Sequence, residues 1–253
     1  MLSMKPIRLA LRCSLAAAAL GVALALTSCR GFQPIEHQPH AAPSAGVAGN
    51  PGSHDPASAE ATEGWRPLFD GRSKDGWKMV GPGDCKLKGG ELVTHGGMGL
   101  FYYEREKLGN CQVRVVFKLT GAHNNSGVFI RIPQPPRDPW YAVNHGYEVQ
   151  IANGGDQFHS TGVLYSLTKA LNIVGAKVGE WNTMLITLDG LRTQVEVNGQ
   201  QVTDYKEGDE VPKKKRWHEP ERGPRPELGY LGLQNHDGQT RVHFKEVSVR
   251  PLK

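Results

Sequence analysis

Alternating apolar and polar residues recur along this chain from about residue 64 to its end. Residues 112–119 show the pattern well, because every second side chain is large and apolar: Val113, Val115, Phe117 and Leu119. Successive side chains of a strand point to opposite faces, so this alternation predicts a half-buried strand. Similar short runs, broken by Gly, Asn, Asp and Pro, predict strands at residues 65–69, 77–80, 85–88, 91–94, 100–103, 111–119, 127–132, 146–151, 162–164, 181–188, 194–197, 230–234 and 241–250.

No convincing long amphipathic helix interrupts these strands. Regularly spaced strands with turn signals between them predict an all-β fold, an antiparallel β-sandwich of the jelly-roll type. Asn198 and Gly199 follow an alternating run and form the strongest short hairpin signal in the sequence.

Residues 124–153 hold the best candidate for a functional surface. If residues 126–132 and 147–151 are strands, one face is apolar and carries Val128, Ile130, Ile132, Tyr147, Val149 and Ile151. The opposite face then carries Phe129, Arg131, Glu148 and Gln150. A Pro-rich connection, residues 133–145, lies between them, and its Trp140 and Tyr141 are predicted to form a wall above that face.

The N-terminal residues predict export and lipid attachment. Three basic residues precede an apolar run at 15–26, and Leu26-Thr27-Ser28-Cys29 resembles a bacterial lipobox. About 12 apolar residues are too few to span a bilayer, which takes roughly 20. We therefore expect a signal peptide at 1–28, a lipidated Cys29 with a disordered linker at 29–63, and a folded domain at 64–253. The expected location is the periplasm or cell surface, with the membrane contacted only through the lipid.

Charge adds little to this picture. The formal net charge is +5, and removal of the signal peptide takes away three basic groups and no acidic ones. Residues 213–216 are basic but have acidic neighbours, which is typical of a solvated loop. We therefore predict no nucleic-acid partner. The chain has no Gly-rich dinucleotide fingerprint and no metal-ligand spacing, so no cofactor is predicted, although a structural or catalytic metal stays open.

Two cysteines remain in the predicted domain, Cys85 and Cys111. Export permits a disulfide, and their separation suits a bridge between two strands. The alternative is a pair of buried free thiols.

A set of short motifs, in order, is similar to the 3-keto-disaccharide hydrolase domain family over residues 65–252. The motifs are Trp65-Arg-Pro-Leu-Phe-Asp-Gly71, Asp75-Gly-Trp77, Asn125-Ser-Gly-Val-Phe-Ile-Arg131, Gly146-Tyr-Glu-Val-Gln-Ile151, Gly179-Glu-Trp-Asn182, Val197-Asn-Gly199 and Gly229-Tyr-Leu-Gly-Leu-Gln-Asn-His236. The resemblance implies a concanavalin A-like jelly roll. It also implies cleavage of glycosides whose C3 hydroxyl has been oxidised to a ketone, so a separate sugar oxidoreductase would act first. The chain departs from the family at Cys85 and Cys111, where bulky aromatics are more usual, and this favours the bridge.

A 3-keto group acidifies the hydrogen on C2, so cleavage by elimination and hydration needs a base, a donor at the enolate oxygen and an acid at the leaving oxygen. From their facing and residue type, we assign Glu148 as the base and Arg131 as the enolate stabiliser. His236 or His145 is the proton donor. Sugar-binding candidates are Asn125, Phe129, Trp140, Gln150 and Gln234.

Three alternatives stay open. Glu148 and Arg131 form only a cross-strand ion pair on a solvated face. The sandwich is a non-catalytic carbohydrate-binding module. Conventional hydrolysis uses Glu148 with a second carboxylate, Asp156 or Asp237.

Overall fold

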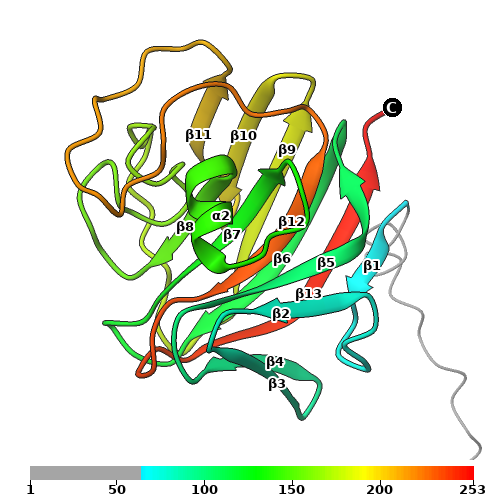
Figure 1. Ribbon diagram of the computed structural model, residues 1–253. Helices are drawn as coiled ribbons and strands as arrows, with labels where there is room; N and C mark the ends of the chain where they lie inside the picture. The colour runs from blue at the N-terminus through cyan, green and yellow to red at the C-terminus, as the bar shows by residue number, and fades with distance from the viewer. Residues whose placement is uncertain (1–63) are drawn as a thin grey trace, which may run out of the picture. The chain divides into compact units, whose positions relative to one another are not determined.

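A computed structural model describes residues 64–253, which fold into two packed antiparallel sheets with one short helix (Figure 1). The all-β sandwich prediction is therefore confirmed. The predicted signal peptide, Cys29 and linker lie outside the described residues and stay predictions. Within residues 64–253, no helix is long and apolar enough to cross a membrane.

The larger sheet has the strand order β11-β10-β9-β6-β13-β4-β3, with β1 also paired to β13. Its strands are β1 (Arg66–Phe69), β3 (Asp84–Lys88), β4 (Glu91–His95), β6 (Cys111–Leu119), β9 (Asn182–Asp189), β10 (Arg192–Val197), β11 (Gln200–Lys206) and β13 (Val242–Pro251).

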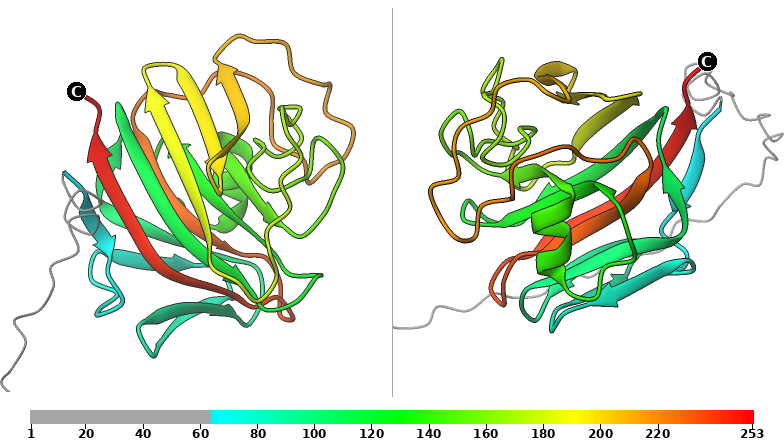
Figure 2. Two further views of the ribbon diagram at one scale, coloured as in Figure 1. Left: turned by 180° about the vertical axis from the view of Figure 1, so that it is seen from behind. Right: turned by 45° about the horizontal axis from the view of Figure 1, so that its top comes forward.

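The smaller sheet has the order β2-β5-β12-β7-β8. Its strands are β2 (Trp77–Val80), β5 (Gly99–Leu108), β7 (Asn125–Ile132), β8 (Tyr147–Ala152) and β12 (Gly229–Asn235). The views of Figure 2 show this sheet lying against the larger one, with the helix on its outer side.

The core lies between the sheets and is made of the inward side chains of both. Val115 and Phe117 of β6 and Val128 and Val149 of β7 and β8 are fully buried there. Each such side chain stabilises the fold by about 1.5–3 kcal/mol through the apolar surface it removes from water. The apolar positions of the alternating pattern are the side chains that form this core.

One strand prediction is wrong, and one strand was not predicted. Residues 162–164 form no strand and make only a single bridge, Val149 to Leu164. Residues 200–206, after the predicted Asn198-Gly199 turn, form β11, a strand that is not among those predicted. Their sequence, QQVTDYK, alternates weakly and is polar at its start, so periodicity alone gave no signal.

A short helix, α2 (Pro139–His145), occupies the connection expected to be irregular. The Asp138 side chain accepts a hydrogen bond from the backbone N–H of Tyr141, and Pro139 takes the first helical position. Both are standard helix-start signals. Ala142 and Val143 pack the helix onto the outer face of the smaller sheet, over a second apolar cluster that includes Phe129 and Ile132.

A β-bulge in β7 reverses the predicted facing of Arg131. Gly232 of β12 pairs with Phe129 and Tyr230 pairs with Ile132, so two residues of β7 oppose one of β12. Arg131 has a φ of 55°, in the left-handed region. A Cβ at Gly229 would collide with the Arg131 backbone, which explains the glycine opposite the bulge. Arg131 therefore points into the sandwich and Ile132 points outward under α2, the reverse of the sequence-based prediction.

The predicted bridge between Cys85 and Cys111 is wrong, and both cysteines are buried free thiols. They lie on β3 and β6, which β4 and β13 separate. Three strand spacings make about 14 Å, whereas a disulfide needs Cα atoms about 4.4–6.8 Å apart. Burial raises the pKa of Cys85 to about 12 and that of Cys111 to about 11, so both thiols are chemically inert at neutral pH.

Candidate active site

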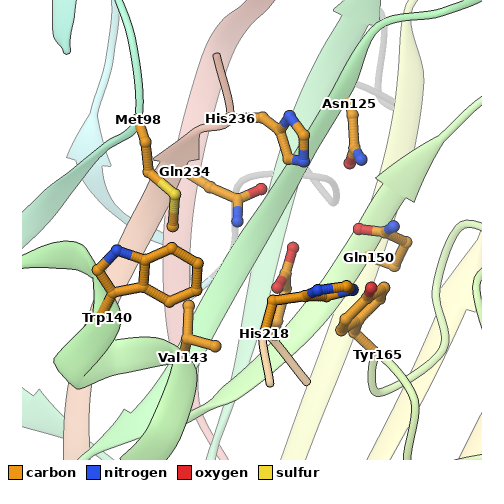
Figure 3. Close-up of a pocket in the computed structure, with 10 residues that line it drawn as sticks. Met98, Asn125, Trp140, Val143, Gln150, Tyr165, His218, Gln234 and His236 are labelled. Atoms are coloured by element: carbon orange, nitrogen blue, oxygen red, sulfur yellow. The ribbon is translucent and has the colours of Figure 1, made fainter. Parts of the chain in front are cut away.

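A pocket of about 290 Å³ opens on the outer face of the smaller sheet, beside α2. β7, β8 and β12 form its floor, α2 forms one wall, and the segments after β4, β8, β11 and β12 supply the remaining lining residues. Figure 3 shows the ten lining residues, which are Met98, Asn125, Trp140, Val143, Glu148, Gln150, Tyr165, His218, Gln234 and His236. α2 covers the part of the outer sheet face that contains Phe129, and the pocket lies on the part that α2 leaves uncovered.

Glu148 provides the only carboxyl group among these lining residues. It projects from β8 and is 9% exposed. Burial raises the pKa of Glu148 to about 8, and a hydrogen bond with Gln234 opposes this rise only in part. A carboxyl that changes its protonation state near neutral pH is suited to proton transfer with a substrate.

Gly127 makes room for the Glu148 side chain. It lies on β7 and pairs with Gln150 on β8. A Cβ at this position would come within 2.6 Å of both Cγ and Oε1 of Glu148. Any side chain at residue 127 would therefore displace the carboxyl group, and the glycine in the NSGVFIR motif keeps the pocket floor open.

Three side-chain amides surround the carboxyl group with unused hydrogen-bonding capacity. The carbonyl oxygens of Asn125, Gln150 and Gln234 are buried and have no hydrogen-bond partner among the described residues. Buried polar atoms are seldom left unpaired, because each costs about 1–3 kcal/mol. Three of them around one pocket point to a polar ligand, and sugar hydroxyls would satisfy them.

His236 is held at the pocket by its neighbour Asp237. Nδ1 of His236 lies 2.9 Å from Oδ2 of Asp237. Partial burial raises the pKa of Asp237, but hydrogen bonds from His236 and from the backbone of Thr240 and Gln239 outweigh it and lower this pKa overall. The carboxylate can only accept a hydrogen bond, so Nδ1–H of His236 donates and Nε2 remains free for a ligand.

Two exposed tryptophans meet at the rim of the pocket. Trp140 of α2 is 37% exposed, and Trp217, in the loop between β11 and β12, is 76% exposed. Their ring centroids are 5.0 Å apart. The next residue, His218, enters the pocket itself. Exposed indole rings beside a polar pocket are suited to packing against sugar faces.

Buried polar contacts hold this loop in place. The Arg225 guanidinium donates to the backbone oxygens of Asn144 and Gly146, at the end of α2. The backbone N–H of Arg225 donates to Glu207, whose carboxyl also accepts a 2.5 Å hydrogen bond from the Tyr147 hydroxyl. The loop that carries Trp217 and His218 is thereby tied to the end of α2 and, through Glu207, to Tyr147 at the start of β8.

Most of the predicted site residues lie together in the pocket: Glu148, Gln150, Gln234, Asn125, Trp140 and His236. Arg131 does not, because the bulge turns it into the sandwich, where it donates to the backbone oxygens of Gly190, Arg192, Pro226 and Glu227. Its predicted roles as enolate stabiliser and as ion-pair partner of Glu148 are wrong for that reason.

His145 and Phe129 also lie elsewhere. His145 is exposed at the end of α2, where its ring packs against Tyr141 with centroids 4.6 Å apart. Phe129 is buried beneath α2 and contributes to the second apolar cluster. Neither lines the pocket, so the roles predicted for them, proton donor and sugar ligand, do not fit the structure.

Four lining residues were not predicted: Met98, Val143, Tyr165 and His218. The position of Val143 could have been predicted, because Asp138-Pro139 is a helix-start signal and the inner side of that helix would cover the sheet. Tyr165 and His218 sit in irregular segments without periodicity, and no sequence signal distinguishes them. Among the described residues, no group of three or more His, Cys, Asp or Glu side chains is arranged to hold a metal ion.

Comparisons with known proteins agree with this fold. The model of the 3-keto-alpha-glucoside-1,2-lyase-like domain family matches residues 64–250. No curated protein matches the chain.

The chain is also similar to solved structures. Two Parabacteroides distasonis proteins, described as candidate glycosyl hydrolases, share 24% and 22% identity with it at TM-scores of 0.63 and 0.60. The alignments cover 74% and 77% of this chain and 99% and 97% of theirs. A Bacillus subtilis protein of unknown function with a galectin-like fold shares 11% identity at a TM-score of 0.53, over 74% of this chain and 97% of its own. At these identities the likeness concerns the fold.

Proposed function

The chain belongs to the 3-keto-alpha-glucoside-1,2-lyase-like domain family, and on that premise we propose that it cleaves 3-keto-glycosides by elimination followed by hydration. The family makes the protein carbohydrate-active, either glycoside-cleaving or carbohydrate-binding. The catalytic proposal is carried by one observation: the Glu148 carboxyl is buried at the floor of a walled pocket, and burial raises its pKa to about 8.

A single well-placed base is what the elimination requires. The 3-keto group lets the C2 hydrogen leave as a proton, and the resulting enolate expels the substituent on C1. Glu148 takes the C2 proton in its ionised form. Donors near the C3 oxygen would stabilise the negative charge that develops there, and the Gln150 amide and the His236 ring both line the pocket.

Conventional glycoside hydrolysis fits this pocket less well. It uses two carboxylates on either side of the scissile bond. Glu148 is the only acidic residue among those that line the pocket. Asp237 is engaged by His236 and Thr240, and Asp156 by His159 and the backbone of Phe158. Neither of these two carboxylates, which the sequence offered as partners of Glu148, lines the pocket.

The proposal predicts a specific isotope pattern. The purified protein is incubated in D₂O with methyl 3-keto-glucoside and, separately, with methyl glucoside. We expect cleavage of the keto substrate alone, with deuterium on C2 of the 3-keto-glucose formed, because hydration returns a solvent-derived proton to that carbon. Mass spectrometry and proton NMR measure both results, and an enzyme-free incubation corrects for spontaneous exchange of the acidic C2 hydrogen.

Other outcomes would reject the proposal. Cleavage of methyl glucoside would favour hydrolysis by two carboxylates. Cleavage of the keto substrate without deuterium at C2 would exclude the elimination. Binding of the keto substrate without any cleavage would make the protein a carbohydrate-binding module.

A further inference from the structure

A second hollow adjoins the active-site pocket. It has a volume of about 490 Å³ and is lined largely by polar residues, among them His123, Asp156, His159 and Arg216. Asn125, Gln150 and Tyr165 line both this hollow and the pocket. A glycoside that places its keto sugar over Glu148 therefore has room on the far side of these three residues for the group attached to C1.

Tyr165 is fixed at the boundary between the two spaces. Its backbone N–H donates to the backbone oxygen of Glu148 at 2.9 Å, which ties it to β8 beside the carboxyl group. The residue before it, Leu164, forms the bridge to Val149. On the side of the second hollow, its ring contacts His159 with centroids 5.1 Å apart. Figure 3 shows the Tyr165 ring next to Gln150 at the edge of the pocket.

Tyr165 differs chemically from the two other boundary residues. Asn125 and Gln150 have amide side chains, which form hydrogen bonds but do not give up a proton. Tyr165 has a phenol hydroxyl, which does. Burial, and next the charge of Glu148, raise the pKa of Tyr165, so its hydroxyl keeps its proton at neutral pH. His236 and His218 line the pocket but not the second hollow.

We propose that the group leaving from C1 occupies the second hollow and that the Tyr165 hydroxyl protonates the glycosidic oxygen at the boundary. This step rests on the proposed function. It replaces His236 as the proton donor and leaves that histidine to contact the keto sugar.

The cycle balances with two protein groups. Glu148 removes the C2 proton, and the electron pair of that bond forms the enolate. The enolate collapses to a C1–C2 double bond and expels the oxygen on C1, which takes the Tyr165 proton and departs as an alcohol. Hydration runs in the opposite sense: water attacks C1 and the Tyr165 phenolate takes its proton, while Glu148, after its proton has exchanged with solvent, protonates C2. Both groups are restored without any oxidant or reductant.

The test compares leaving groups in the variant Tyr165→Phe. A 4-nitrophenolate leaves without protonation, whereas methanol or a sugar alcohol needs a proton. We expect kcat/KM to fall about 10²–10⁴-fold for methyl 3-keto-glucoside, and far less for the 4-nitrophenyl analogue, because only the first reaction needs the acid. Tyr230→Phe is the matched control: it removes a hydroxyl from a tyrosine that packs on Tyr102, outside both spaces, and should change neither rate.

Equal losses on both substrates, or no loss on either, would overturn the assignment of Tyr165 while leaving the proposed function intact. A wild-type protein that cleaves neither substrate would overturn the proposed function, and this step with it.

The second hollow is tested by Arg216→Ala. Arg216 lines the hollow but not the pocket, and its side chain is exposed. If the leaving group lies in the hollow, KM should rise several-fold for a 3-keto-disaccharide and stay unchanged for the methyl glycoside, which leaves the hollow empty. Equal KM changes for both substrates, or none for either, would overturn this placement.

Discussion

Replacement of Glu148 by glutamine is expected to lower turnover of a 3-keto-glycoside about 10²–10⁴-fold, the usual cost of losing a general base. Glutamine keeps the shape of the side chain and fits the space left by Gly127, but it cannot accept the C2 proton. The amides that would hold the sugar hydroxyls are unchanged, so substrate affinity should survive. Turnover per folded molecule and substrate affinity by calorimetry, measured on one preparation, check both expectations.

The dependence of the wild-type kcat/KM on pH tests the same role of Glu148. Because Glu148 acts in its ionised form and has a pKa of about 8, kcat/KM should rise with pH through that region. In Glu148→Gln, the residual rate should lose this step. A wild-type rate that falls through pH 8 would mean that the protonated carboxyl is the active form, as in an acid rather than a base.

The same substitution should change how stability depends on pH. The pKa of Glu148 is raised from an ordinary value of 4.5 to about 8, so between these values the folded state holds a proton that the unfolded state has lost. The free energy of unfolding of the wild type therefore decreases as pH rises across this window, by up to about 1.4 kcal/mol per pH unit from this group. Glu148→Gln lacks that contribution, so its free energy of unfolding relative to that of the wild type should increase from pH 5 to pH 8.

Two results would count against Glu148 as the base. Unchanged turnover per folded molecule would remove it from the mechanism and leave His236 as the remaining predicted candidate in the pocket. A variant that is strongly destabilised at every pH would indicate that the carboxyl group serves the fold. A structural ion pair with Arg131 is not available as an explanation, because Arg131 lies on the other face of the sheet.

Replacement of Arg131 by alanine should have its main effect on stability. The side chain is 1% exposed, and its guanidinium donates to four backbone oxygens and to the Thr193 hydroxyl. Its loss would leave several buried acceptors unsatisfied, each at a cost of about 1–3 kcal/mol. We expect the free energy of unfolding to fall by about 3 kcal/mol or more, as measured by chemical denaturation.

Activity separates this role from a catalytic one. Turnover per folded molecule of Arg131→Ala should stay within about tenfold of the wild type, whereas loss of an oxyanion-stabilising donor typically costs about 10²–10³-fold. Arg72→Ala is the control, because the side chain of Arg72 is 88% exposed and its removal should change stability by less than about 0.5 kcal/mol. A stable but inactive Arg131→Ala protein would contradict the position of this residue in the structure.

The sequence predicted much of the fold because each strand is specified by the residues of its own segment. In residues 111–119, the alternation of apolar and polar side chains fixes both the strand and the face that it buries, and β6 has those bounds in the structure. Hairpin signals such as Asn198-Gly199 fix turns in the same way. These local patterns therefore predicted the sandwich and most of its strands, although they do not show how the strands pair.

Part of the pocket was predictable for the same reason. Glu148 and Gln150 are two residues apart on β8, so a strand necessarily places them on one face, and Gln234 occupies the corresponding polar position in β12. These three residues meet because β12, β7 and β8 are neighbours in the smaller sheet. The sequence determined their facing, and the strand order brought them together.

Only the tertiary structure decided the rest. One residue of bulge in β7 moves Arg131 from the pocket face into the core, because a strand has a side-chain period of two and a single inserted residue reverses it. Tyr165 and His218 reach the pocket from irregular segments whose paths depend on distant contacts, such as those of Arg225 with the end of α2. The sequence by itself thus determined most of the strands and the residues on the floor of the site. The walls, the inward position of Arg131 and the place of Tyr165 between the two spaces depend on long-range packing that no local pattern encodes.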